Sequence, residues 1–219
     1  MRIRVLLVLA ALCTAICAAP GAAIASPAVP PVSDAAQAAG LVDVRTVVPD
    51  AVIDLRYATP NNFVHVPLYP ADARCLMHDS MAPGLAAAAA VLRTGGEVLV
   101  FWDCYRPHDV QVRMFDAVPD PNWVARPGPY ARSHEAGRSV DVTIANAAGP
   151  VDMGTDFDDF TPRALAYATE NVSAAAQANR ARLRDAMKAG GLTVYKGEWW
   201  HFDTSDAYEK RPILNVAVD

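Results

Sequence analysis

The sequence predicts a single compact α+β domain in which a central, mainly antiparallel sheet is packed by helices. Apolar or alternating β-prone segments lie at 97–104 and 138–146, and alanine-rich helical patterns lie at 80–96 and 171–191. These segments do not follow one another as regular strand–helix–strand units, which disfavours a parallel doubly wound sheet. A chain of 219 residues suits one domain of ordinary size.

The first 25 residues have the features of a secretory signal peptide. Arg2 and Arg4 precede an apolar run, and residues 23–25 read Ala-Ile-Ala, the small-x-small pattern of a signal peptidase site. The run is short for a membrane span, which needs roughly 20 apolar residues. We therefore expect cleavage before Ser26 and a secreted or periplasmic protein, with a retained membrane anchor as the alternative.

After the leader, residues 26–41 are small and Pro-rich, and we expect them to form a flexible N-terminal lead before a domain spanning 42–219. Loss of the two leader arginines takes the formal charge from −5 to −7. This acidity argues against a nucleic-acid partner, because such binding relies on clustered Lys and Arg. We further expect no membrane span after cleavage, and a monomer or a weak homo-oligomer.

The elements of the N-terminal half follow from local patterns. Residues 42–58 are valine-rich and alternate in places, which predicts one or two strands. Three prolines and an Asn pair make 59–75 mostly loop. A serine, a first-turn proline, an alanine run and a closing Gly pair predict a helix over 80–96. The apolar segment 97–104 predicts a buried strand.

The C-terminal half continues the mixture of helices and strands. Residues 108–117 predict a helix, and 171–191 predict the clearest helix of the chain, which closes on a Gly pair. Apolar and polar side chains alternate in 138–146, as in a strand with two different faces. The segments 192–195 and 199–202 predict two short strands.

Two cysteines, Cys75 and Cys104, remain once the leader is removed. An even pair in an exported chain suggests one disulfide. Two buried free thiols are the alternative, since a sequence does not show whether the two Cα atoms come within bonding range.

Two Gly-punctuated stretches combine histidine with a carboxylate. In SHEAGRSVD, His134 lies in a loop and Asp141 on the polar face of the following strand, so the two can converge. In KGEWWHFD, Glu198 stands three residues before His201. Imidazole nitrogens and a carboxylate oxygen suit Zn²⁺, and a catalytic zinc typically takes three protein ligands and keeps one position open.

His134, Asp141 and His201 would complete such a set, and Glu198 would take the proton of the bound water. Because residues i and i+3 of a straight strand point to opposite faces, Glu198 must lie in a turn or bulge before the strand. Arg106 follows the predicted buried strand, where a guanidinium could hold a carboxylate or a developing oxyanion. The zinc site would therefore be built on strands and loops.

Each of these side chains, taken alone, also has an ordinary explanation. His134 could be a hydrogen-bonded loop histidine, and His201 could be a core histidine beside two tryptophans. Asp141 could be a solvated strand residue, and Arg106 could form a surface ion pair. The residues by themselves leave these alternatives open.

The two stretches together, SHEAGRSVD and then EWWH, resemble the zinc D-Ala-D-Ala peptidase family. Four further blocks narrow the resemblance to the VanX-type D-alanyl-D-alanine dipeptidases: DLRYATPNNF, DCYRP, PVDMGTDFD and AQANRARLRDAM. The blocks keep the family's order from about residue 42 through EWWH. The resemblance implies a small α+β domain, one zinc ion per chain and a small D,D-dipeptide such as D-Ala-D-Ala as substrate.

The resemblance also implies a role for each matching position. These roles are zinc ligation by His134, Asp141 and His201, the catalytic base for Glu198, steadying of the tetrahedral intermediate for Arg106, contact with the substrate's amino group for Asp158, and pocket lining for Tyr57 and Ser133. One position departs from the pattern, because Arg132 stands where the vancomycin-resistance enzymes have serine. It lies near the substrate's C-terminal carboxylate in the family, so Arg132 puts fine specificity in doubt.

Three other functions remain open at this point. A DD-carboxypeptidase of the same zinc family would trim peptidoglycan stem peptides in the cell wall. A non-catalytic peptidoglycan-binding domain would keep the fold without turnover. A purely structural zinc site would favour four closed protein ligands, and no obvious fourth ligand stands in the sequence.

Overall fold

The computed structural model describes residues 28–219, so the predicted signal peptide, residues 1–25, lies outside the described part of the chain. Within that part, the larger sheet has the strand order β2-β4-β5-β8-β7, with β6 paired to β5, and a smaller sheet pairs β1 with β3. The strands are β1 Leu41–Asp43, β2 Val52–Ile53, β3 Leu76–His78, β4 Val98–Asp103, β5 Ser139–Asn146, β6 Gly149–Pro150, β7 Thr193–Val194 and β8 His201–Asp203. Only the pairing of β2 with β4 is parallel among these strands. The predicted α+β class with a mainly antiparallel sheet is confirmed.

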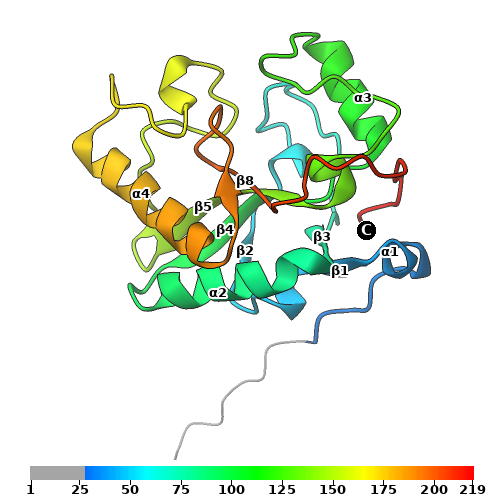
Figure 1. Ribbon diagram of the computed structural model, residues 1–219, viewed down its shortest axis with the longest axis horizontal. Coiled ribbons are helices and arrows are strands. Elements are labelled where there is room, and N and C mark those ends of the chain that lie inside the picture. The colour runs from blue at the N-terminus through cyan, green and yellow to red at the C-terminus, as the bar shows by residue number, and fades with distance from the viewer. Residues whose placement is uncertain (1–27) are drawn as a thin grey trace, which may run out of the picture.

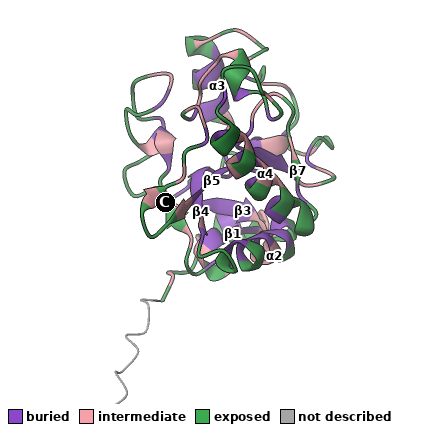
Figure 2. Ribbon diagram, turned by 90° about the vertical axis from the view of Figure 1, so that its left-hand side faces the viewer, coloured by how far each residue is buried: buried purple, intermediate pink, exposed green. Residues whose placement is uncertain are grey.

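Helices pack around this sheet, and α3 lies on the far side of the domain from α2 (Figures 1 and 2). The helices are α1 Asp34–Ala38, α2 Ala82–Arg93, α3 His108–Ala117 and α4 Ala174–Ala189, and 3-10 turns span Val44–Thr46, Arg56–Ala58, Asp79–Met81, Ser133–Ala136 and Pro162–Ala164. α2 and α4 approach so closely that a methyl group on Gly190 would overlap the backbone of Gly84. None of the helices in residues 28–219 is long and apolar enough to cross a membrane.

β4 and β5 form the middle of the larger sheet. Val140, Val142 and Ile144 of β5 are fully buried on one face, as the alternating pattern predicts. The polar side chains of the other face, Asp141 and Thr143, are only 3% exposed. Figure 2 shows both strands among the buried parts of the molecule. Buried polar side chains are usually hydrogen-bonded, which directs attention to what lies over Asp141.

The expectation of a flexible lead over 26–41 is wrong from residue 34 onward. The Ser33 side chain accepts a hydrogen bond from the Ala36 amide and caps α1. Ala36 and Leu41 are each 1% exposed, and Leu41 begins β1. Burial of these apolar side chains against the domain outweighs the loop-like composition of the segment.

Two other predicted boundaries change. The strand expected over 199–202 begins only at His201, because Trp199 and Trp200 lie in a turn. The helix expected over 80–96 spans 82–93 and follows a 3-10 turn. The first change matters for the site, since it puts the residues before His201 outside the strand.

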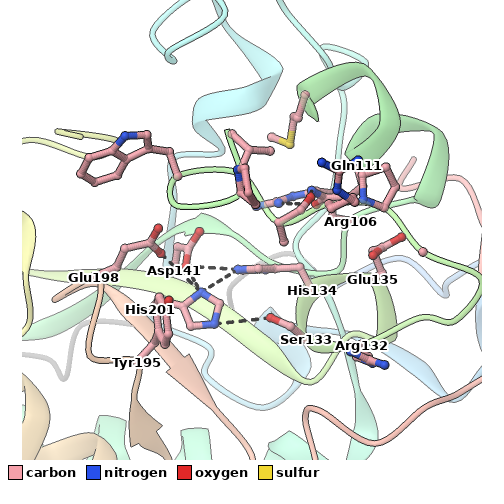
Figure 3. A pocket seen from close by; sticks show the side chains of 18 of the residues that line it. Arg106, Gln111, Arg132, Ser133, His134, Glu135, Asp141, Tyr195, Glu198 and His201 are labelled. Atoms are coloured by element: carbon pink, nitrogen blue, oxygen red, sulfur yellow. Dashed lines mark hydrogen bonds and ion pairs between the residues drawn. The ribbon is translucent and has the colours of Figure 1, made fainter. Parts of the chain in front are cut away.

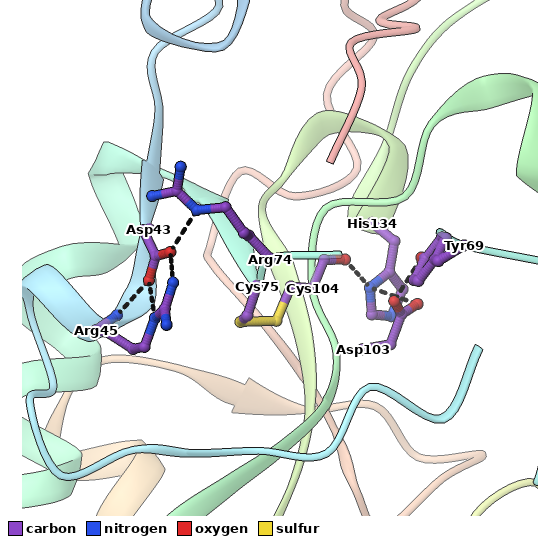
Figure 4. Close-up of a disulfide and its surroundings, with 8 residues drawn as sticks. All are labelled: Asp43, Arg45, Tyr69, Arg74, Cys75, Asp103, Cys104 and His134. Atoms are coloured by element: carbon purple, nitrogen blue, oxygen red, sulfur yellow. Dashed lines mark hydrogen bonds and ion pairs between the residues drawn. A yellow bond between two sulfur atoms is a disulfide. The ribbon is translucent and has the colours of Figure 1, made fainter. Parts of the chain in front are cut away.

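Cys75 and Cys104 form a disulfide, so the two cysteines are not free thiols (Figure 4). Their Cα atoms are 5.3 Å apart, and the bond joins the segment that enters β3 to the residue that follows β4. Both residues are buried. The backbone carbonyl of Cys104 also accepts a hydrogen bond from the His134 ring, so the bridge lies directly behind the site described next.

Candidate metal centre

Three buried side chains bring one ligand atom each to a single point (Figure 3). His134 lies in the 3-10 turn Ser133–Ala136, which ends at Gly137 in the left-handed region with φ +64°. Asp141 lies on β5 directly opposite His201, the first residue of β8. His134 Nε2 is 3.2 Å from Asp141 Oδ1 and 3.0 Å from His201 Nδ1, and His201 Nδ1 is 2.9 Å from Asp141 Oδ1.

In each histidine ring, one nitrogen faces the other ligand atoms and the other, outer nitrogen faces away from them. The hydrogen-bond partner of the outer nitrogen determines which nitrogen carries the hydrogen. His134 Nδ1 lies 2.7 Å from the Cys104 carbonyl, which only accepts, so this nitrogen carries the hydrogen. His201 Nε2 lies 2.9 Å from Asp203 Oδ1. Burial opposes the charge of Asp203, but His201 together with the hydroxyls of Ser139 and Tyr208 outweighs it and holds the pKa of Asp203 below its usual range. Asp203 is therefore an acceptor, and His201 Nε2 donates. In the neutral form of each ring, the nitrogen that faces the cluster is therefore a lone-pair acceptor.

Two imidazole lone pairs and a carboxylate oxygen thus face one another. Burial alone would lower the pKa of His201, but Asp141 and Asp203 outweigh it and raise this pKa well above the usual value, so the point attracts positive charge. A cation bound by all three atoms would remove the electrostatic repulsion between them. Imidazole nitrogen and carboxylate oxygen are ligands that suit Zn²⁺, and hydrogen bonds at the outer nitrogens are typical of ligating histidines. The residues present fit a zinc ion.

Glu198 stands beside this cluster in a turn, as the i, i+3 spacing requires. Its Oε2 is 3.8 Å from His201 Nδ1, and its backbone amide donates to the Tyr195 carbonyl at 3.3 Å. Burial raises the pKa of Glu198 to about 7, against the lowering effect of His201. Trp199 and Trp200 are fully buried beneath the turn. Both are core residues, and neither lines the cavity into which the cluster opens.

Arg106 extends into the same cavity and is tightly held. Its Nε and Nη2 donate to Asp103 Oδ2 at 3.0 and 2.6 Å, and its Nη1 donates to Gln111 Oε1 at 2.7 Å. The guanidinium carbon lies 5.3 Å from the centre of the Tyr57 ring. A guanidinium has five N–H donors, so about two remain for a ligand. Asp103 is itself fixed by the Tyr69 hydroxyl at 2.6 Å.

Asp158 lies across the cavity and receives the Tyr57 hydroxyl at 3.0 Å. Its backbone is in the left-handed region, with φ +55°. Its enclosed position and the nearby carboxylates of Glu198 and Asp141 raise the pKa of Asp158 well above its usual value. A positive group beside Asp158 would relieve this repulsion.

The predicted site residues all line one cavity of about 600 Å³: Tyr57, Arg106, Arg132, Ser133, His134, Asp141, Asp158, Glu198 and His201. Ser133 Oγ is 3.4 Å from His201 Nε2. Arg132 is exposed, and Figure 3 shows its side chain directed away from the two histidines.

The sequence did not identify the side chains that hold these residues. Asp103 and Gln111 fix Arg106, and Asp203 fixes His201. Short sequence spacings could have indicated two of these contacts. Asp203 follows His201 on the same face of a short strand, and Asp103 stands three residues before Arg106. The rest of the cavity wall, notably Trp123 and Phe160, comes from loops that carry no such signal.

An α+β domain in which two paired strands and a 3-10 turn bring two histidines and an aspartate together, beside a buried glutamate, has the site of a zinc metallopeptidase. The chain belongs to the D-Ala-D-Ala dipeptidase family, since the model of that family, described as "D-ala-D-ala dipeptidase", matches residues 37–219.

The D-alanyl-D-alanine dipeptidase of Escherichia coli K12 is 36% identical over 168 residues, which are 76% of this chain and 86% of that protein. The dipeptidase of the same name from Enterococcus faecium is 28% identical over 173 residues, or 70% of this chain and 85% of that protein. Among solved structures, the D,D-pentapeptidase VanY in complex with Zn(II) is a more distant match, with 16% identity and a TM-score of 0.38 over 59% of this chain and 72% of that chain. Similarity at that last level supports no conclusion about the site.

Proposed function

We propose that the protein is an exported zinc dipeptidase that hydrolyses D-Ala-D-Ala and related D,D-dipeptides with a free amino terminus. One observation supports the proposal most directly. The cluster of His134, Asp141 and His201 lines a single cavity together with three further side chains, Glu198, Arg106 and Asp158. This combination offers a metal position, a proton carrier, a donor for an oxyanion and an acceptor for an ammonium group. The names of the relatives support the substrate class.

His134, Asp141 and His201 would hold the zinc ion. Zinc in such a setting lowers the pKa of a bound water and polarises a carbonyl. Glu198 would accept a proton from the attacking water and return it to the leaving amine. Burial raises the pKa of Glu198, and this direction supports the role, because a carboxylate with a raised pKa takes up a proton more readily near the operating pH.

Arg106 would stabilise the oxygen that becomes negative as water attacks the peptide carbonyl. Asp103 and Gln111 already fix the guanidinium, so little reorganisation is needed when charge develops. The N–H groups left over supply the donors. The tight hold on Arg106 therefore supports preorganised electrostatic stabilisation.

Asp158 would bind the substrate's amino group, with Tyr57 orienting the carboxylate. A carboxylate in an enclosed cavity rejects ligands that leave it unpaired, which disfavours blocked and longer peptides. Ser133 and Arg132 line the same cavity, and the cation of Arg132 could attract the substrate's carboxylate end. The preferred second residue would depend on it.

Export is proposed on two supports. The signal-like pattern of residues 1–25 is one, and the Cys75–Cys104 disulfide is the other. Disulfides persist mainly in oxidising compartments. A secreted or periplasmic location follows.

Purified, zinc-loaded protein assayed on D-Ala-D-Ala, L-Ala-L-Ala and N-acetyl-D-Ala-D-Ala tests the proposal, together with a metal analysis. We expect about one zinc per chain and hydrolysis of the free D,D-dipeptide alone. Cleavage of the acetylated dipeptide or of a stem pentapeptide would support a DD-carboxypeptidase instead. Bound zinc without turnover of any peptide would support a non-catalytic peptidoglycan-binding domain.

A further inference from the structure

Asp158 and Glu198, the two carboxylates with separate tasks in the proposed reaction, both lie on irregular segments. Asp158 belongs to the connection 151–161 between β6 and a 3-10 turn, and its φ is +55°. Glu198 belongs to the turn between β7 and β8. Neither residue has strand pairing of its own, so their relative position depends on what joins the two segments.

Arg180 of α4 donates hydrogen bonds to backbone carbonyls both before and after Asp158 in the sequence. Its side chain is 1% exposed. Its Nε donates to the Met153 carbonyl at 2.7 Å, and its Nη1 donates to the Arg163 carbonyl at 2.8 Å and the Leu165 carbonyl at 3.3 Å. One side chain thus binds the backbone before and after the carboxylate.

The same guanidinium reaches the segment of Glu198. Its carbon lies 5.3 Å from the centre of the Trp199 ring. The Trp199 indole donates to Thr155 Oγ1 at 2.7 Å, and the Trp199 amide donates to the Ala164 carbonyl at 3.0 Å. Arg180 and Trp199 therefore join the connection of Asp158 to the turn of Glu198.

Burying the charged side chain of Arg180 carries a desolvation penalty that an apolar core residue would not have. Within residues 28–219 no carboxylate pairs with Arg180, and its Nη2 has no hydrogen-bond partner. Burial and the nearby Arg184 and Arg163 lower the pKa of Arg180 to about 10, so it remains a cation at neutral pH. An apolar side chain would avoid this desolvation. What arginine alone supplies is a planar fork that binds several carbonyls at fixed angles.

We infer that Arg180 is a positioning residue that fixes the Asp158 carboxylate relative to Glu198 and thereby sets the preference for substrates with a free amino group. The inference rests on the proposed function. Arg180 is not among the residues that line the cavity, so it acts only through the segments it holds.

The variant Arg180→Lys tests this role, because lysine keeps the charge and the contact with Trp199 but loses the fork. On zinc-loaded enzyme we expect kcat/KM for D-Ala-D-Ala to fall roughly 10- to 100-fold, as small displacements of positioning groups do, and mainly through a higher KM. The preference for D-Ala-D-Ala over its N-acetyl form should shrink, while zinc content stays unchanged. Arg182→Lys on the same helix is the control, since Arg182 is half exposed and pairs with Glu97 at 2.7 Å. An unchanged KM and an unchanged preference in Arg180→Lys would overturn the inference.

A second measurement separates this inference from the proposed function. Hydrogen–deuterium exchange of the zinc-loaded variant should rise in 153–165 and 196–199 and not in α2. This holds even if the wild-type protein cleaves no peptide, an outcome that removes the proposed function alone. If Arg180→Lys does not fold, Thr155→Val removes the acceptor of the Trp199 indole at nearly constant volume. It should give the same changes on a smaller scale, and wild-type KM and exchange in Thr155→Val would reject the inference.

Discussion

His134 and His201 are each held at the nitrogen that faces away from the cluster, one by the Cys104 carbonyl and the other by Asp203. These bonds fix which nitrogen carries hydrogen and how each ring is turned. The geometry of the three acceptors is therefore set before any ion arrives. Preorganisation of this kind raises metal affinity because less order must be imposed on binding.

Replacing Asp203 by alanine should weaken zinc binding about 10- to 100-fold, the usual effect of losing such an outer partner. His201 would keep its place on β8 but lose the acceptor for Nε2–H. Competition with a chromophoric chelator measures the affinity. Asp206→Ala serves as the control, since Asp206 pairs with Arg138 and Arg211 instead of a ligand. Equal affinities in the two variants would contradict the role of Asp203.

The variant Glu198→Gln should keep its zinc and lose roughly 100- to 10,000-fold in kcat, the range for a general acid–base group. Glutamine fills the same space but neither takes nor returns a proton at neutral pH. Steady-state kinetics with a parallel metal analysis make the measurement. Glu135→Gln removes another cavity carboxylate, which pairs with His108, and should retain most of the activity. Full activity in Glu198→Gln would remove Glu198 from the mechanism.

At the scale of elements, the antiparallel register of β5 and β8 puts Asp141 opposite His201. A slip by one residue would turn one of the two side chains to the other face of the sheet. The disulfide adds a second constraint, because it fixes the chain just after β4, where Cys104 meets His134.

Removing the disulfide with Cys75→Ser and Cys104→Ser should lower the free energy of unfolding by about 3 to 4 kcal/mol, the loop-closure value for cysteines 29 residues apart. Zinc affinity should fall as well, since the Cys104 carbonyl is freer to move. Urea unfolding of metal-free protein and a zinc titration test the two effects. Thiol reduction of the wild-type protein should reproduce both, and an unchanged affinity would separate the bridge from the site.

Elements with a strong local pattern were predicted to within a few residues, for example the helix 108–117 and the strand 138–146. The lead was predicted wrongly because alanine and proline composition does not show that Leu41 pairs with β3. All nine proposed site residues line one cavity, but spacing alone left them open and the family resemblance made the choice. Supports such as Tyr69, which donates to Asp103 across 34 residues of chain, were missed because a single sequence carries no signal for contacts between distant segments.

Across the whole molecule, Asp43 is a junction between the lead and the domain (Figure 4). Its fully buried carboxylate accepts from Arg45 at 2.7 Å and from Arg74 at 2.9 Å. Arg74 also donates to the carbonyls of Pro30 and Pro31. Burial opposes the charge, but the two arginines outweigh it and hold the pKa of Asp43 below its usual value.

Because this pKa is lower in the folded state, the stabilisation from Asp43 is fully present above its unfolded pKa of about 4 and is lost as pH falls through the folded pKa. Asp43→Asn should cost about 2 kcal/mol of unfolding free energy at pH 6, since hydrogen bonds to a charged group are lost. The difference from wild type should shrink below about pH 4. Urea unfolding of both metal-free proteins from pH 6 to pH 3 gives the comparison, and a difference that does not vary with pH would count against this account.

The proposed ligands are unevenly spread along the chain. His134 and Asp141 are seven residues apart, whereas His201 follows Asp141 by sixty. A chain that ends before His201 offers only two of the three donors, so the ion would be captured only by a completed molecule. Proteolytic loss of the C-terminal segment would therefore abolish zinc binding and activity together. The zinc content per chain of a preparation would then equal the fraction of its molecules that are intact.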